Sequence, residues 1–292
     1  RRGHGVWAPN RFAAPYFAEE VRRFLLDQLD REQVFEEGLQ VYTTLDMRMQ
    51  RAAEAALLSA LDDFDASRLA SLERRGRAED FQPVSGALVC LDNRAGFQGF
   101  VRAMVGGRDF TKEKYNTTTQ ARRQPGSSVK PFVWAAAIAN GMTPSTIIID
   151  EPYVKVNATG AWRPKNFDGS FGGPRTLRES LEKSVNIVSI KLVERVGVPS
   201  VRNIMQRAGI TTPIDDAVGL TIGLGTPVVH PLDHAVAYSV FANQGTRYDA
   251  VLVKEIEDRD GISRYHYRSY QKTEQAIDPA VAYVVSYMMQ GV

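Results

Sequence analysis

The sequence predicts an α+β fold in which antiparallel strands are flanked by helices. Apolar residues recur at helical spacing in several segments, for example from Leu177 to Val196. Two pairs of apolar runs, within 87–105 and 251–268, are each separated by turn residues, as in β-hairpins. The 292 residues, 43% hydrophobic and 24% charged, are typical of a globular protein with one large domain, or one domain and a smaller attachment.

Charge and cysteine content exclude some classes of protein. Thirty-six basic and 34 acidic residues give a net charge of +2 without a long run of either sign, which argues against a nucleic-acid partner. The single cysteine, Cys90, excludes an internal disulfide, and its apolar surroundings predict a buried position. No apolar run reaches the ~18 residues of a membrane span. Because the sequence opens on Arg1 rather than Met, we expect a fragment, in which absent targeting signals carry no information.

The first part of the chain is expected to contain both helices and strands. In order, the patterns predict a helix from Tyr16 to about Leu29, a strand at 41–44, a helix from Asp46 to about Leu61, a charged loop over 65–80, and a hairpin formed by 87–91 and 100–105. Asp46 stands where its carboxylate would cap the helix that follows.

Ser127 and Lys130 carry a chemical signal that depends on its context. They follow the turn residues Pro125 and Gly126 and precede an apolar run, so their i, i+3 spacing places a hydroxyl and an amine together on the first turn of a buried helix. A seryl nucleophile needs a base in this position. An N-capping serine and a surface lysine are the alternative interpretation of the local pattern. A second Ser-x-x-Lys, at 180–183, has no preceding turn, and we interpret it as a solvated helix face.

The second part of the chain is mainly helical in its pattern. In order, the sequence predicts an irregular, aromatic-rich flap over 143–168, a helix from Thr176 to Val196, helices at 199–208 and 234–242, a hairpin within 251–268, and a last helix from about Pro279. Thr176 and Glu179 form a capping box at the start of the long helix, and Gly197 suits its end.

Ser184 and Asn186 lie within that long helical pattern. Residues two apart on an unbroken helix point about 200° away from each other. If both side chains serve one site, the helix must therefore break there and become two helices. The alternative is that they are two polar residues on a solvated face.

Two further patterns do not support a cofactor or a metal. Gly223-Leu224-Gly225 lacks the third glycine and the strand-to-helix frame of a dinucleotide site, so we expect a turn. His230 and His234 have the i, i+4 spacing of a helical metal pair, but Pro231 places His230 at the helix start and no third ligand is near in sequence. We therefore expect neither a cofactor nor a metal ion.

Taken together, these segments resemble the transpeptidase domain of class A (bifunctional) penicillin-binding proteins. The resemblance rests on motifs in the family's order: V-Y-T-T-L-D at 41–46, G-G-R-D-F at 106–110, R-R-Q-P-G-S-S-V-K-P-F at 122–132, W-R-P-K-N-F-D-G at 162–169, S-V-N at 184–186 and H-P-L-D-H-A-V-A-Y-S-V-F-A-N-Q-G at 230–245. It implies the fold of penicillin-binding proteins and serine β-lactamases, with the C-terminal strands missing. It also implies a connector at 1–40, following an absent glycosyltransferase domain, and a truncated D,D-transpeptidase domain at 41–292.

The resemblance implies a role for each site residue. Ser127 would attack the penultimate D-Ala carbonyl of a D-Ala-D-Ala stem peptide, and Lys130 would take the seryl proton. Ser184 would relay a proton to the leaving D-Ala nitrogen, while Asn186 would hold the substrate amide and Lys130. Phe167, in the flap, would line the mouth of the cleft and contact substrate. The physical chemistry agrees, because a lysine acts as a base only when burial or nearby positive charge lowers its pKa from about 10.4.

The implied partners are peptidoglycan stem peptides, their lipid-linked precursor and β-lactam antibiotics. A membrane would be contacted only through an absent N-terminal part of the parent protein. The implied location is the bacterial cell envelope, at the outer face of the inner membrane or in the periplasm. A D,D-carboxypeptidase, in which water replaces the acceptor amine, and a non-catalytic penicillin-binding sensor or scaffold are the alternatives.

One motif of the family is not present in this sequence. The string nearest to Lys-Thr-Gly is Lys272-Thr273-Glu274, in which glutamate replaces the glycine that lets the substrate backbone approach closely. It also precedes the last predicted helix, whereas the family's motif follows that helix. We expect the true element beyond Val292, and slow acylation of the 292-residue chain by itself.

Overall fold

The computed structural model describes residues 13–157 and 160–292 and divides the chain into two compact units. Unit 1 comprises the residues up to Ala121 together with Asp249–Lys272. Unit 2 comprises Arg122–Tyr248 and Thr273–Val292, so the chain enters each unit twice. The connector predicted at 1–40 stays a prediction, and its first 12 residues lie outside the described residues.

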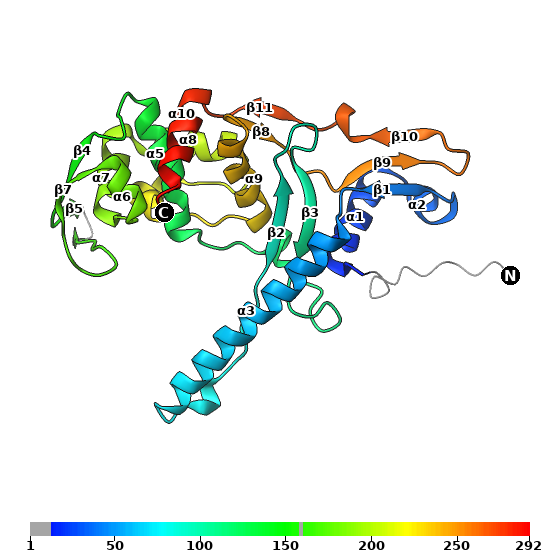
Figure 1. The fold of residues 1–292 in the computed structure, drawn as a ribbon, viewed down its shortest axis with the longest axis horizontal. Coiled ribbons are helices and arrows are strands. Elements are labelled where there is room, and N and C mark those ends of the chain that lie inside the picture. Colours follow the sequence, from blue (N-terminus) through cyan, green and yellow to red (C-terminus); the bar gives the residue numbers. More distant parts are fainter. Residues whose placement is uncertain (1–12, 158–159) are drawn as a thin grey trace. The chain divides into compact units, whose positions relative to one another are not determined.

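Unit 1 combines helices with antiparallel strands (Figure 1). Its helical elements are α1 (Pro15–Gln28), α2 (Arg31–Glu36), α3 (Met47–Glu73), η2 (Ala78–Asp80), α4 (Thr117–Gln120) and η5 (Tyr267–Ser269). Its strands are β1 (Gln40–Thr43), β2 (Leu88–Asp92), β3 (Phe100–Val105), β9 (Val253–Glu257) and β10 (Ser263–His266). Strand β9 lies between β1 and β10, and β2 pairs with β3. Both predicted hairpins are therefore confirmed.

Helix α3 begins as predicted but continues further than expected. The Asp46 carboxylate caps it by accepting from the backbone N–H groups of Arg48 and Met49. The charged segment 65–80, expected to be a loop, is helical up to Glu73, so that prediction is wrong for most of the segment. In this part of the helix, the largely buried Asp65 carboxylate accepts from the Arg108 guanidinium at 2.6 Å, which compensates for its burial.

Cys90 in β2 is half-buried, so its predicted full burial is also wrong. It packs at the margin of a small apolar cluster formed by Ala53, Ala103 and Val105. In the part of the chain that the structure describes, no helix has the length and apolarity needed to cross a bilayer.

Unit 2 is mainly helical and contains short antiparallel strand pairs (Figure 1). Its helical elements are η3 (Gly126–Val129), α5 (Lys130–Ala139), α6 (Leu177–Glu182), α7 (Asn186–Val196), α8 (Val198–Ala208), η4 (Asp216–Leu224), α9 (Pro231–Ala242) and α10 (Pro279–Met289). The strand pairs are β4 (Ile147–Asp150) with β7 (Gly173–Thr176), β5 (Lys155–Asn157) with β6 (Gly160–Trp162), and β8 (Thr246–Tyr248) with β11 (Thr273–Gln275).

Helix α5 is the centre of the core of unit 2. Its residues from Phe132 to Ala137 have no solvent-exposed surface, and it contacts α6, α7, α8 and α10. The Trp134 indole N–H donates to the Leu177 carbonyl at 2.8 Å, which fixes α5 against α6. A helix buried on all sides is a rigid support for the residues at its N-terminus.

The segment 143–168, predicted to be an irregular flap, is partly regular. It contains β4, β5 and β6, and β4 pairs with β7, which lies beyond the predicted flap. Within β4, Ile148 is buried between the exposed Ile147 and Ile149, so only one face of the strand reaches the core. The helices predicted at 199–208 and 234–242 and from Pro279 are confirmed.

Candidate active site

Ser127 and Lys130 stand where the 3-10 turn η3 becomes helix α5. Ser127 lies in η3 and is exposed, whereas Lys130 begins α5 and has no solvent-exposed surface. The first helical turn is thus a 3-10 turn, and the i, i+3 pair meets because side chains three apart eclipse in that geometry. The Lys130 amine lies 3.1 Å from the Ser127 hydroxyl.

The helix break required at 184–186 is confirmed. Helix α6 ends at Glu182 and α7 begins at Asn186, with Ser184 between them at a φ of 53°. This left-handed conformation is uncommon for a residue other than glycine and costs on the order of 1–3 kcal/mol. In return, Ser184 and Asn186 both reach Lys130 Nζ, with Ser184 Oγ at 2.9 Å and Asn186 Oδ1 at 2.8 Å.

The structure therefore brings four of the five predicted site residues together around one buried amine. Burial lowers the pKa of Lys130 to about 8. A neutral fraction of the amine is then available near neutral pH, and its lone pair can accept a proton from a neighbouring hydroxyl. The arrangement is chemically suited to activating Ser127 as a nucleophile.

Phe167, the fifth predicted residue, is fully exposed. It lies between β6 and β7, and its predicted contact with substrate stays a prediction. Ser128, the residue that follows Ser127, makes other contacts. Its hydroxyl donates to the Pro125 carbonyl at 2.7 Å and lies 2.9 Å from His234 Nε2.

Gly225 is a residue of this site that the sequence did not reveal. It has a φ of 73°, and a Cβ at this position would lie 2.0 Å from the Gly126 carbonyl oxygen. The turn that precedes Ser127 thus packs directly on the backbone of Gly225. The Gly-x-Gly string at 223–225 signalled a turn, but no local pattern indicates which backbone approaches it.

Asn166 is a second residue that the sequence left without a role. It lies within the W-R-P-K-N-F-D-G motif, and its side chain accepts from the backbone N–H groups of Asn186 and Ile187. The quoted motif was a signal for this position, but the contact depends on a tertiary arrangement.

Two other strings resemble the family's motifs in composition, namely Ser-x-x-Lys at 180–183 and Lys-Thr-Glu at 272–274. Each contains a side chain that makes contacts of its own within the fold. Ser180 is buried and donates to the Thr176 carbonyl at 2.8 Å, so the interpretation of the second Ser-x-x-Lys as a solvated helix face is wrong for its serine. Glu274, in the Lys-Thr-Glu string, forms ion pairs with Arg207 at 2.9 Å and Arg247 at 3.3 Å.

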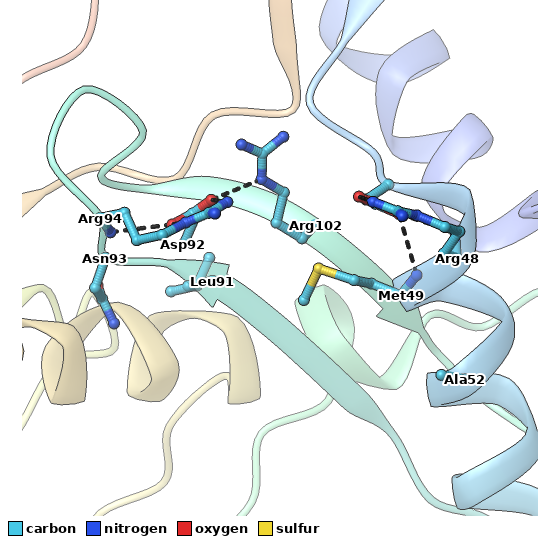
Figure 2. Close-up of a pocket in the computed structure, with 9 residues that line it drawn as sticks. Arg48, Met49, Ala52, Leu91, Asp92, Asn93, Arg94 and Arg102 are labelled. Atoms are coloured by element: carbon cyan, nitrogen blue, oxygen red, sulfur yellow. Dashed lines mark hydrogen bonds and ion pairs between the residues drawn. The ribbon is translucent and has the colours of Figure 1, made fainter.

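A pocket of about 580 Å³, lined by both charged and apolar residues, lies within unit 1 (Figure 2). Among its lining residues, Arg94 and Arg102 both bind the Asp92 carboxylate, and the Arg94 hydrogen bonds hold the pKa of that carboxyl well below its usual range. The pocket is lined by no serine, cysteine or histidine and shares no residue with the Ser127 site.

Over residues 13–157 and 160–292, no three His, Cys, Asp or Glu side chains gather as metal ligands.

Comparison with known proteins gives a consistent result. The family model described as "Penicillin binding protein transpeptidase domain" matches residues 86–292. Penicillin-binding protein 1A of Neisseria gonorrhoeae is 42% identical over 216 residues, which are 72% of this chain and 26% of that protein. The chain thus spans about a quarter of the length of this curated relative.

Two solved structures of PonA1 from Mycobacterium tuberculosis resemble the chain. The first has a TM-score of 0.76 at 25% identity and covers 94% of this chain and 68% of that one. The second, a complex with penicillin V, has a TM-score of 0.72 at 24% identity and covers 94% and 69%. The second likeness concerns the fold alone.

Proposed function

Because the chain belongs to the penicillin-binding protein transpeptidase family, we propose that it carries the seryl acyl-enzyme site of a peptidoglycan D,D-transpeptidase. The observation that supports this most directly is the convergence of the Ser127, Ser184 and Asn186 side chains on the amine of Lys130, at 2.8–3.1 Å. Neutral Lys130 accepts the Ser127 proton while the serine oxygen attacks the penultimate D-Ala carbonyl carbon of a stem peptide.

The tetrahedral intermediate then expels the terminal D-Ala. The carbon–nitrogen bond breaks, and the leaving nitrogen receives a proton from the Lys130 ammonium through the Ser184 hydroxyl. This step leaves an ester on Ser127 and a neutral lysine. An amine of a second stem peptide attacks the ester, Ser127 regains its proton, and the product is a new amide cross-link. General acid–base assistance of this kind contributes about 10²–10⁴ in rate.

β-Lactams are the expected inhibitors of the same serine. Their strained amide resembles the D-Ala-D-Ala terminus, so attack by Ser127 would open the ring and leave a stable ester. The complex of the Mycobacterium tuberculosis protein with penicillin V supports this for a protein of the same fold. Since peptidoglycan is cross-linked outside the cytoplasm, we place the reaction in the bacterial cell envelope.

A fluorescent penicillin tests the proposal on the whole protein. Wild type should be labelled at Ser127, and Ser127→Ala should not be labelled. Ser180→Ala is the matched control, because Ser180 belongs to the second Ser-x-x-Lys and is buried; it should keep the label. An adduct on another residue, or a labelled Ser127→Ala protein, would contradict the proposal.

Product analysis separates the transpeptidase from its alternatives. Incubation with stem-peptide substrate should give cross-linked dimers that depend on Ser127. Trimmed peptides alone would indicate a D,D-carboxypeptidase. Binding of stem peptide with neither product nor adduct would indicate a sensor or scaffold.

A further inference from the structure

Helix α7 begins without a capping side chain of its own. Its N-cap position is occupied by Val185, whose side chain has no oxygen that could accept from the first amide groups. The Asn166 side chain supplies the acceptor, since its Oδ1 accepts from the N–H of Asn186 at 3.0 Å and of Ile187 at 3.2 Å. The start of α7 therefore depends on a residue about 20 positions earlier in the chain.

The orientation of the Asn166 carboxamide is set by Asp150 at the end of β4 and by the Ser170 carbonyl, which accepts from the same NH₂ group at 2.8 Å. A carboxylate only accepts hydrogen bonds, so the NH₂ group of Asn166 must face it, at 2.8 Å from Asp150 Oδ1. The Asp150 side chain is 1% exposed, and its other oxygen accepts from the Gly172 N–H at 2.8 Å and lies 3.4 Å from Arg175 Nε. Since a buried carboxylate needs all of these partners, the contact with Asn166 is firmly held.

The same helix start carries the groups that contact Lys130. Asn186 is the first residue of α7, and its amide NH₂ also donates to the Lys165 carbonyl at 3.1 Å, next to Asn166. Ser184 precedes it by two residues and has a strained left-handed backbone. A shift of the start of α7 would therefore move both groups away from the amine.

We propose that Asp150 and Asn166 form a positioning pair that holds Ser184 and Asn186 within reach of Lys130. Neither residue of the pair contacts Lys130 or Ser127, so both act through the start of α7. Strand β4, which ends at Asp150, lies close to β7 and to helix α7 in unit 2 (Figure 1), so packed elements hold the Asp150 half of the pair. The kinetic consequence rests on the proposed acyl-enzyme function, whereas the capping itself does not.

Exchanging the two residues tests the pair in the whole protein. Asn166→Asp sets two carboxylates against each other. Asp150→Asn leaves one acceptor oxygen for the two N–H groups, of Asn166 and Gly172, that the carboxylate accepts from in the wild type. Each single variant should be acylated by a chromogenic β-lactam up to about 100-fold more slowly, the cost of a small misplacement of reacting groups. In the double variant D150N/N166D the acceptor at α7 and the donor–acceptor contact between the two residues are both restored, but the donation to the Ser170 carbonyl is lost. Part of the acylation rate should therefore return, so that the double variant is faster than either single variant.

Glu151→Gln is the matched control for the loss of a charge on this part of the chain. Glu151 follows Asp150 directly and pairs with Lys191 on α7, away from the helix start. The acylation rate of the Glu151→Gln protein should remain that of the wild type. Equal acylation rates in the wild type and in both single variants would contradict the proposal that the pair positions Ser184 and Asn186. A double variant that is acylated no faster than the single variants would also contradict it.

Hydrogen exchange provides a measurement that does not depend on catalysis. The amides of residues 186 and 187 should exchange faster in Asn166→Ala than in the wild type, and no faster in Glu151→Gln. Unchanged protection of these two amides in Asn166→Ala would contradict the proposal that Asn166 caps α7. If the wild type forms no adduct at Ser127, the proposed function fails, and the exchange experiment still decides whether the pair caps α7.

Discussion

At the residue scale, Lys130 is the group whose surroundings determine the proposed chemistry. It is fully buried, yet it has no acidic partner among its hydrogen-bonding contacts, which are hydroxyl, amide and carbonyl oxygens. Burial without a counter-charge favours the neutral amine, and the pKa falls to about 8. The sequence predicted that burial would act in this direction.

The pH dependence of acylation should follow the protonation state of the Lys130 amine. Because only the neutral amine accepts the seryl proton, the second-order rate of β-lactam acylation should rise about tenfold per pH unit below about 8 and level off above it. Lys130→Arg keeps the positive charge but cannot lose its proton, so it should show no acylation at any pH. A wild-type rate that stays constant across this range would contradict the role of Lys130 as base.

His234 should make the stability of unit 2 depend on pH. Burial lowers the pKa of His234 below its unfolded value of 6.5, so the native state favours the neutral ring. The resulting stabilisation is complete above that unfolded value and is lost as the pH falls through the lower native one. Denaturant unfolding at a series of pH values should show this loss, and His234→Gln should show less of it. An equal loss in both proteins would assign it to other groups.

At the element scale, the turn before Ser127 depends on its contact with η4. Gly225→Ala would force a Cβ into the Gly126 backbone and also strain a residue with a φ of 73°. We expect a loss of about 2–4 kcal/mol in the free energy of unfolding, and slower acylation because the Ser127 turn must move.

Gly261→Ala is the control for this substitution. Gly261 has a similar φ of 78°, but no atom lies within 4 Å of a Cβ built there. Its substitution should cost only the backbone strain of about 1–2 kcal/mol and leave acylation unchanged. Equal effects of the two substitutions on acylation would contradict the importance of the close approach at Gly225.

The elements that the sequence predicted well are those with local signals. The cap at Asp46, the capping box at Thr176 and the stop at Gly197 each lie within one turn of the helix that they define. The elements that it missed depend on distant partners. Strand β4 is stabilised by β7, more than 20 residues later, and the last turns of α3 by Arg108.

At the scale of the whole molecule, the sequence predicted the meeting of Ser127, Lys130, Ser184 and Asn186 only through the family resemblance. No spacing rule brings together residues separated by more than 50 positions, as Lys130 and Ser184 are. The local rule contributed one conditional statement, that the helix must break if both polar residues serve one site. The contacts of Gly225 and Asn166 were beyond reach because they arise from tertiary packing.

The missing Lys-Thr-Gly string leads to a prediction for the molecule as a whole. If the whole protein supplies that element as an oxyanion donor, the 292-residue chain should be acylated about 10²–10³-fold more slowly than the whole protein. Stopped-flow acylation with the same β-lactam compares the two. Equal rates would show that residues 1–292 already contain every donor that acylation needs.

Lys130 is the first residue of α5, but the two side chains that contact its amine, Ser184 and Asn186, lie at the break between α6 and α7. A chain in which these helices have come apart retains its serine and its lysine but has no assembled base. Covalent capture by an antibiotic would thus count only molecules in their native conformation. The fraction of a preparation that reacts, followed during heating or storage, would serve as a direct assay of how much of the protein is correctly folded.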